Sequence, residues 1–167
     1  AQASAVIRFI QSRLKDIASA NAEDTQAAEK RGTSAAMIDR LTLTHDRILA
    51  MAKAVRDIAA LPDPVGEVVS RDTRPSGIRV ARVRVPLGVI AMIYEARPNV
   101  TVDAASLTLK SGNSVLLRGG KEAGRSNAAL ARVVRSALAE TGLPEDAVQI
   151  VPPGDRDEIR ALVRLAG

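Results

Sequence analysis

The 167-residue sequence has no cysteine and no tryptophan, and only one histidine, one tyrosine and one phenylalanine. Without cysteine there is no disulfide framework and no thiolate zinc site, so a reducing cytoplasmic location is expected. The common pairs of nucleophile and base are missing too, and no spacing of metal ligands occurs. Because there is almost no aromatic ring for stacking, binding of single-stranded nucleic acid is disfavoured. No run of about 18 apolar residues occurs, so no membrane span is expected.

What the sequence does contain is an aliphatic core and an excess of positive charge. Apolar residues make up 46% of the chain and aromatic residues 1%, so the core must consist of Ala, Val, Ile and Leu. Such a core is ordinary for helices packed on a parallel sheet. The net charge of +5 and the pI near 10.2 favour anionic partners, namely phosphates, acidic substrates or nucleic acid.

Four helices are predicted in the first 64 residues, from apolar periodicity and capping residues. An amphipathic stripe runs through residues 6–17. Asn21, Ser34 and Thr44 are the predicted N-caps of the next three helices. Gly32 is predicted to end the second helix, and two prolines end the helical region.

A β-hairpin is predicted next, from residues 66–70 and 78–85 around a turn at 72–77. Its arginines form a basic ribbon from Arg71 to Arg84. A hairpin alone is marginally stable in water, so this one is expected to pack on something outside the segment. A solvated edge, a subunit contact and a nucleic-acid-binding arm all stay open as its role.

Three short apolar runs then alternate with two helical segments. The runs are residues 89–93, 114–117 and 148–151, bounded by Gly, Pro and Asn. Strands that alternate with helices pair in parallel, and such apolar runs predict strands buried on both faces. The expected fold is therefore α/β, with amino-terminal helices, a β-hairpin and then an incomplete parallel βαβαβ Rossmann-like core.

Two charged loops follow the first two of these strands, at residues 94–99 and 118–122. Ligands of open parallel sheets bind beyond the carboxyl ends of the strands, so function is expected here. The second loop carries Gly119 and Gly120 beside basic residues and precedes a helix, an arrangement that suits a phosphate. A solvated turn is the alternative for the same residues.

Residues 84–127, RVPLGVIAMIYEARPNVTVDAASLTLKSGNSVLLRGGKEAGRSN, closely resemble the γ-glutamyl phosphate reductase family, also called glutamate-5-semialdehyde dehydrogenases, of the aldehyde dehydrogenase superfamily. Further matching stretches make the resemblance cover essentially the whole chain. It implies NADPH-dependent reduction of γ-glutamyl 5-phosphate to glutamate 5-semialdehyde in proline biosynthesis. It also implies a homo-oligomer in the complete enzyme and no nucleic-acid or membrane partner. The family's nucleophilic Cys lies downstream of this portion, so this piece alone is expected to be inactive.

The resemblance divides the chain into three parts. Residues 1–64 match the helical part of the cofactor-binding domain, residues 65–86 an oligomerisation hairpin, and residues 87–167 a truncated Rossmann-like NADP-binding segment. Two alternatives from other classes stay open: a non-catalytic basic domain that binds nucleic acid through the hairpin, and a scaffold that supports assembly.

The family positions its cofactor along loops whose matching residues here are Tyr94, Glu95, Arg118, Gly119, Gly120 and Lys121. NAD-using relatives carry an acidic residue where Lys121 stands, and the charge reversal suits the 2′-phosphate of NADP(H). The superfamily also uses an Asn amide in its oxyanion hole, for which Asn99 is the nearest candidate. Arg97 stands at the matching register and could instead face the phosphate or carboxylate of the substrate.

Overall fold

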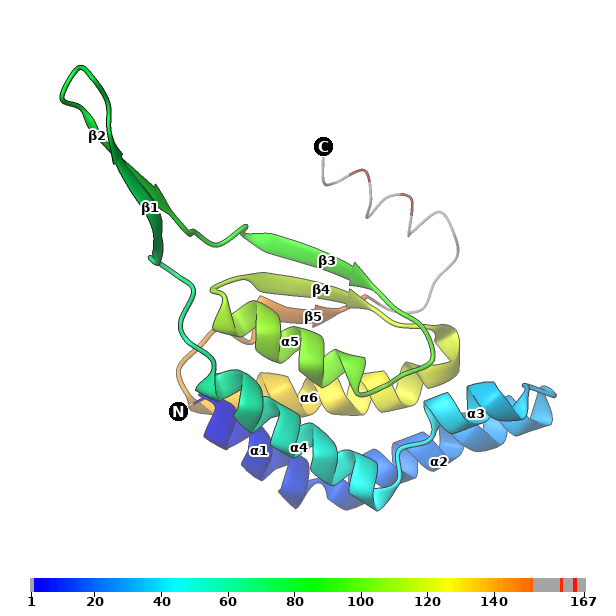
Figure 1. Cartoon of the computed structure of the whole chain (residues 1–167). Helices are drawn as coiled ribbons and strands as arrows, with labels where there is room; N and C mark the ends of the chain where they lie inside the picture. Colours follow the sequence, from blue (N-terminus) through cyan, green and yellow to red (C-terminus); the bar gives the residue numbers. More distant parts are fainter. Residues whose placement is uncertain (1, 152–159, 161–163, 165–167) are drawn as a thin grey trace.

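A three-stranded parallel sheet forms the upper layer of the molecule in Figure 1, a computed structural model that describes residues 2–151, 160 and 164. Its strands are β3 (Val89–Ile93), β4 (Ser114–Arg118) and β5 (Val148–Ile150), in the order β3-β4-β5. Both neighbouring pairs are parallel. The three predicted strands and their parallel pairing are therefore confirmed. The run Asp155-Arg156-Asp157-Glu158 resembles a capping box and predicts the start of a further helix, but it lies outside the described residues.

Helices α5 (Val100–Lys110) and α6 (Gly124–Glu140) connect the strands and cover one face of the sheet (Figure 1). The side chains of Val115, Leu117 and Val148 point into this layer and are buried. On the other face Val89 keeps 67% of its surface exposed and Ile93 48%. The prediction of strands buried on both faces is thus wrong for β3, because the described helices cover only one face.

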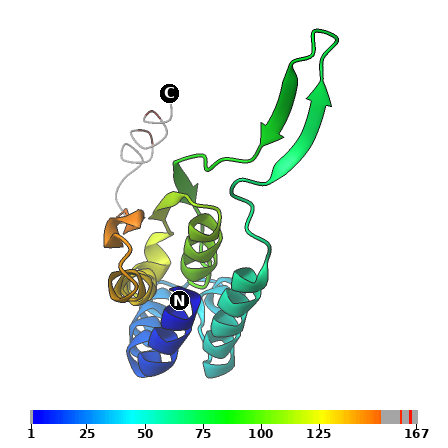
Figure 2. The same cartoon turned by 90° about the vertical axis from the view of Figure 1, so that its left-hand side faces the viewer.

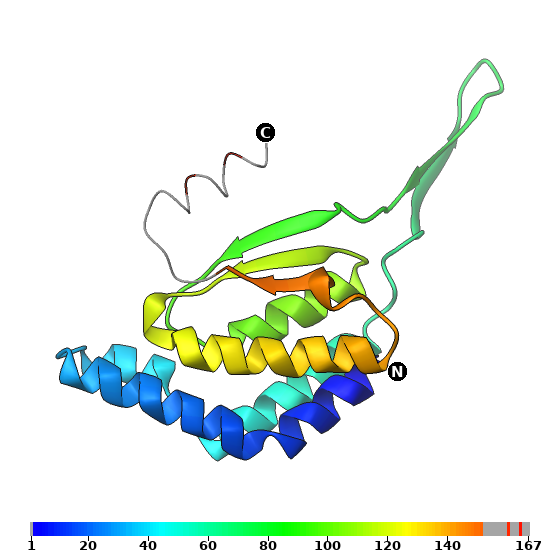
Figure 3. The same cartoon turned by 180° about the vertical axis from the view of Figure 1, so that it is seen from behind.

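A third layer of helices packs under α5 and α6, as Figure 3 shows from behind. It consists of α1 (Gln2–Ser12), α2 (Leu14–Lys30), α3 (Ala35–Leu41) and α4 (His45–Ala60). Most of its buried apolar side chains share one hydrophobic core with those of α5, α6 and the sheet, whereas Ala28 and Leu41 form a separate cluster with Ala123. Ser34 and Thr44 occupy the predicted N-cap positions of α3 and α4. Thr44 Oγ1 accepts a hydrogen bond from the Arg47 backbone N–H, whereas the Ser34 side chain makes no such bond to the backbone of α3.

Asn21 does not cap a helix, contrary to the prediction, because α2 already begins at Leu14 and runs through this position. The Asn21 side chain is buried and donates to the Leu41 carbonyl at 2.9 Å and to Ser126 Oγ at 3.1 Å. Its Oδ1 accepts from the Leu43 N–H at 2.7 Å. A buried amide must find such partners, and these ones tie the connection between α3 and α4 to α6.

The predicted hairpin is present and consists of β1 (Val68–Thr73) and β2 (Arg79–Val83), paired antiparallel. Every residue of both strands is exposed, and the hairpin projects away from the three layers (Figure 2). Two arginines of the basic ribbon form ion pairs within the hairpin region, Arg74 with Asp72 and Arg84 with Glu67. Across the described residues no helix is both long and apolar enough to cross a bilayer.

Candidate functional site

The two predicted loops lie side by side at the carboxyl edge of the sheet. The register of β3 and β4 brings Ile93 opposite Arg118. One residue further on, the Tyr94 N–H donates to the Arg118 carbonyl at 3.0 Å. The ends of the two strands therefore place the six residues predicted to bind the cofactor in one region.

A buried polar chain supports these loops from below. The Tyr94 hydroxyl lies 2.7 Å from Thr101 Oγ1, which donates to Asn127 Oδ1 at 3.1 Å. Thr101 and Asn127 are almost fully buried, and burial raises the pKa of the Tyr94 phenol despite the hydrogen bond with Thr101. Sequence reasoning missed Thr101 and Asn127. The only indication of their role in the sequence was a polar residue on the inner face of α5 and another on that of α6.

Gly119 packs directly against these hydrogen-bonded side chains. A Cβ atom at Gly119 would lie 2.1 Å from Asn127 Nδ2 and 3.1 Å from Tyr94 Cζ. A Cβ at Gly120 would lie 2.7 Å from Glu122 Oε2. Both glycines are buried, so packing within the protein already requires glycine at the first position.

A carboxylate of the protein itself, that of Asp24, occupies the amino end of α6. Asp24 is buried on α2 and accepts from the Ser126 N–H and Ser126 Oγ, both at 2.8 Å, and from the Arg125 N–H at 3.4 Å. These donors are the ones that a phosphate at this helix end would use. Attraction of an anion to this loop therefore depends on the side chains of Arg118 and Lys121.

Those two side chains differ in their surroundings. Arg118 is half-buried at the end of β4, and its Nη1 donates to the Gly119 carbonyl at 3.1 Å. Lys121 begins a 3₁₀ turn (Lys121–Ala123), is exposed, and has no hydrogen bond or ion pair with any other residue that the structure describes. Its ammonium group can reach an anion without breaking an existing contact.

The backbone turns sharply at Ala96 and separates Arg97 from the cofactor loops. Ala96 has a φ of +39°, which L-residues rarely adopt, and the Arg97 N–H donates to the Glu95 carbonyl at 2.6 Å. Tyr94 and Glu95 stay beside Gly119 and Gly120, whereas Arg97 and Asn99 line a cavity on the side of α4. The predicted site residues thus fall into two groups.

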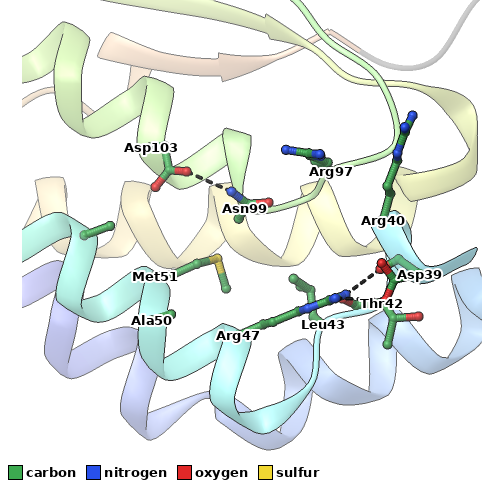
Figure 4. A pocket seen from close by; sticks show the side chains of 11 residues that line it. Asp39, Arg40, Thr42, Leu43, Arg47, Ala50, Met51, Arg97, Asn99 and Asp103 are labelled. Carbon is green, nitrogen blue, oxygen red and sulfur yellow. Dashed lines mark hydrogen bonds and ion pairs between the residues drawn. The ribbon is translucent and has the colours of Figure 1, made fainter. Parts of the chain in front are cut away.

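The cavity has a volume of about 410 Å³ and lies between α4, the connection from α3, and the start of α5 (Figure 4). Asn99 Nδ2 donates to Asp103 Oδ2 at 2.9 Å, while Asp103 Oδ1 is buried with no partner among the described residues. Burial raises the pKa of the Asp103 carboxyl, and the Asn99 hydrogen bond opposes that shift. The lining residues are Asp39, Arg40, Thr42, Leu43, Arg47, Ala50, Met51, Ala54, Arg97, Asn99 and Asp103.

Neither region offers a metal site. Within the described residues no group of three His, Asp or Glu side chains could hold a metal ion. The one histidine of the sequence, His45, is exposed at the start of α4. What the structure assembles is a pair of charged loops, one of which contains Gly119 and Gly120, beside a polar cavity.

The fold is that of a family of oxidoreductases. A model of the aldehyde dehydrogenase family matches residues 8–166, and the chain belongs to that family.

Among individual proteins, the chain is similar to several γ-glutamyl phosphate reductases. It is 60% identical over 151 residues to that of Sorangium cellulosum, an alignment that covers 90% of this chain and 35% of the relative. It is 55% identical to that of Thermobifida fusca, over 98% of this chain and 39% of the relative. The crystal structure of γ-glutamyl phosphate reductase from Thermotoga maritima superposes with a TM-score of 0.93 at 44% identity, covering 98% of this chain and 40% of that one. The chain thus spans about two fifths of the length of these relatives.

Proposed function

We propose that this chain is the cofactor-binding part of a γ-glutamyl phosphate reductase that uses NADPH to reduce γ-glutamyl 5-phosphate to glutamate 5-semialdehyde in the cytoplasm, for proline biosynthesis. The identity of 55–60% to relatives of that name carries the proposal. The paired loops at the carboxyl edge of the sheet support it, because open parallel sheets bind their ligands there.

The residues at this edge fit NADPH, which supplies the hydride when it is bound. Arg118 and Lys121 are the side chains that we assign to its 2′-phosphate, with Gly119 and Gly120 forming the floor and Tyr94 and Glu95 the facing loop. Because Asp24 already occupies the amino end of α6, no free helix end competes with these side chains for the phosphate. The choice between NADPH and NADH then depends on side-chain charge.

Replacing Lys121 with Glu should lower the preference for NADPH over NADH by at least about tenfold in the complete enzyme. The substitution turns attraction of the 2′-phosphate into repulsion and supplies an acceptor for a ribose hydroxyl. A difference of about 1.4 kcal/mol in binding free energy suffices for a tenfold change in preference. The measurement is kcat/KM with each cofactor. Lys15→Glu is the matched control, because Lys15 is an exposed lysine at the far end of α2 from this loop. An unchanged ratio in Lys121→Glu would show that Lys121 does not contact the phosphate.

We further propose that the 167-residue chain does not reduce an acyl phosphate by itself. It has no cysteine, so it offers no thiolate to displace phosphate and activate the acyl group for hydride transfer. The purified chain should give no NADPH oxidation that depends on γ-glutamyl phosphate, measured as absorbance at the nicotinamide band. Steady substrate-dependent oxidation, removed by an inhibitor of the complete enzyme, would refute this.

The hairpin is proposed to pack against another subunit or against further chain in a homo-oligomer. It exposes several aliphatic side chains, with 63% of Ile78 and 48% of Val69 accessible, and a free two-stranded hairpin is marginal in water. Amide hydrogens of residues 68–83 should exchange quickly in the isolated chain and slowly in the complete enzyme. Equal and fast exchange in both would exclude such a contact.

A further inference from the structure

The cavity beside α4 separates opposite charges along its length (Figure 4). Asp103 and Asn99 lie at one end, on the first turn of α5 and just before it. Arg97 and Arg40 lie toward the other end, from the loop after β3 and from α3. A ligand that spans the cavity would meet an anionic group at one end and cationic groups at the other.

The hydrogen bonds show which of these groups are available. Arg47 is held by Asp39 Oδ1 at 2.9 Å and by the Thr42 carbonyl at 3.0 Å, so it forms a fixed wall. The side chains of Arg40 and Arg97 are exposed and form no ion pair or hydrogen bond with the described part of the chain. Asp103 Oδ1 is the single buried side-chain oxygen or nitrogen without a partner in that part.

A buried oxygen without a donor is costly and calls for an N–H group. Asn99 already supplies one donor to the other oxygen of the carboxylate and thereby fixes its orientation. Asp103 as a whole is half-buried and lines the cavity, so a cationic N–H donor at this end would meet its carboxylate. Arg40 and Arg97 would meanwhile attract an anion at the other end.

We propose that Asp103 binds the α-ammonium group of an amino-acid substrate, that Asn99 positions Asp103, and that Arg40 and Arg97 attract the substrate's anionic groups. The inference rests on the proposed function and identifies the residue that distinguishes a glutamyl compound from its analogue without the amine. The volume of about 410 Å³ suits a ligand of this size, since small-molecule sites occupy roughly 300–1,000 Å³.

Titration of the ¹⁵N-labelled chain with L-glutamate and with glutarate tests this, because the two differ only in the ammonium group. L-Glutamate should shift the amide signals of Arg97, Asn99 and Asp103 and bind at least tenfold more tightly than glutarate. Asp103→Asn should bring the two affinities together by weakening L-glutamate alone. Asn99→Ala, which leaves Asp103 charged but unoriented, should give a smaller loss. The control is Asp46→Asn, which removes an exposed carboxylate on α4 and should change neither affinity.

Equal affinity of the wild-type chain for both ligands, or no binding of L-glutamate, would overturn the inference. So would an equal loss for both ligands in Asp103→Asn, because that result would indicate a structural role. In the complete enzyme Asp103→Asn should raise KM for γ-glutamyl phosphate at least tenfold and leave KM for NADPH unchanged. An Asp103→Asn enzyme with unaltered kinetics on γ-glutamyl phosphate would refute the role of Asp103 while supporting the proposed function. A complete enzyme that reduces no γ-glutamyl phosphate would refute the proposed function itself.

Discussion

Replacing Asp24 with Ala should lower the free energy of unfolding by about 3 kcal/mol, the sum of a lost helix cap and of charge-assisted hydrogen bonds in a buried place. The Asp24 side chain is only 3% exposed and accepts from the backbone and the hydroxyl of Ser126 at 2.8 Å. Without it the buried Ser126 N–H loses its acceptor at the start of α6. For a chain of this size the midpoint of thermal unfolding should fall by roughly 6–12 °C, which calorimetry measures directly.

Glu23→Ala is the matched control for Asp24→Ala. Glu23 precedes Asp24 on α2. Both carboxylates form an ion pair with Arg125, Glu23 at 3.0 Å and Asp24 at 3.5 Å, but the Glu23 side chain is 60% exposed. Exposed ion pairs contribute little, so the control should change stability by less than about 0.5 kcal/mol. Similar losses in both variants would mean that charge pairing with Arg125 matters and that the cap of α6 does not.

Replacing Gly119 with Ala should destabilise the chain by about 2 kcal/mol, a typical cost of overpacking a closely packed site. The new Cβ would lie 2.1 Å from Asn127 Nδ2, and Asn127 cannot move freely because it is buried and bonded to Thr101. The loop after β4 should shift outward as a result. Urea unfolding gives the loss of stability, and NADPH binding by the complete enzyme should weaken in parallel.

A double-mutant cycle identifies the clash as the cause. Asn127→Ala removes the atom nearest to the new methyl group, so adding Gly119→Ala to that background should cost at least 1 kcal/mol less than in the wild type, a coupling of about the size found between contacting residues. Additive effects would instead show that Gly119 is required for its backbone conformation or for a neighbour other than Asn127.

Much of the fold could be predicted from the sequence because its signals are local. Apolar runs of four or five residues marked the strands, and Ser34 and Thr44 marked the starts of two helices. The roles of Asn21 and Asp24 could not be predicted in this way. Their partner Ser126 lies 105 and 102 residues further along the chain, and nothing in the local pattern connects them.

The candidate site also has one part that could be predicted from the sequence and one that could not. The loops after β3 and β4 were predictable, since parallel strands bring their carboxyl ends to one edge. The cavity was not predictable. It forms where the connection between α3 and α4 meets the start of α5, and neither segment has a motif that indicates contact with the other. The exposed face of β3 was mispredicted for a similar reason, since burial depends on which helices cover a strand.

The turn at Ala96 has a consequence for how enzymes of this kind can change. It places the residues before it beside the glycine loop and those after it in the cavity, so one peptide unit is the boundary between the two ligand sites that we propose. Substitutions on opposite sides share few contacts, and effects of such substitutions usually add. Selection or engineering could therefore alter the preferred acyl substrate while the nicotinamide preference is inherited unchanged, and the reverse, provided that this single bend is kept.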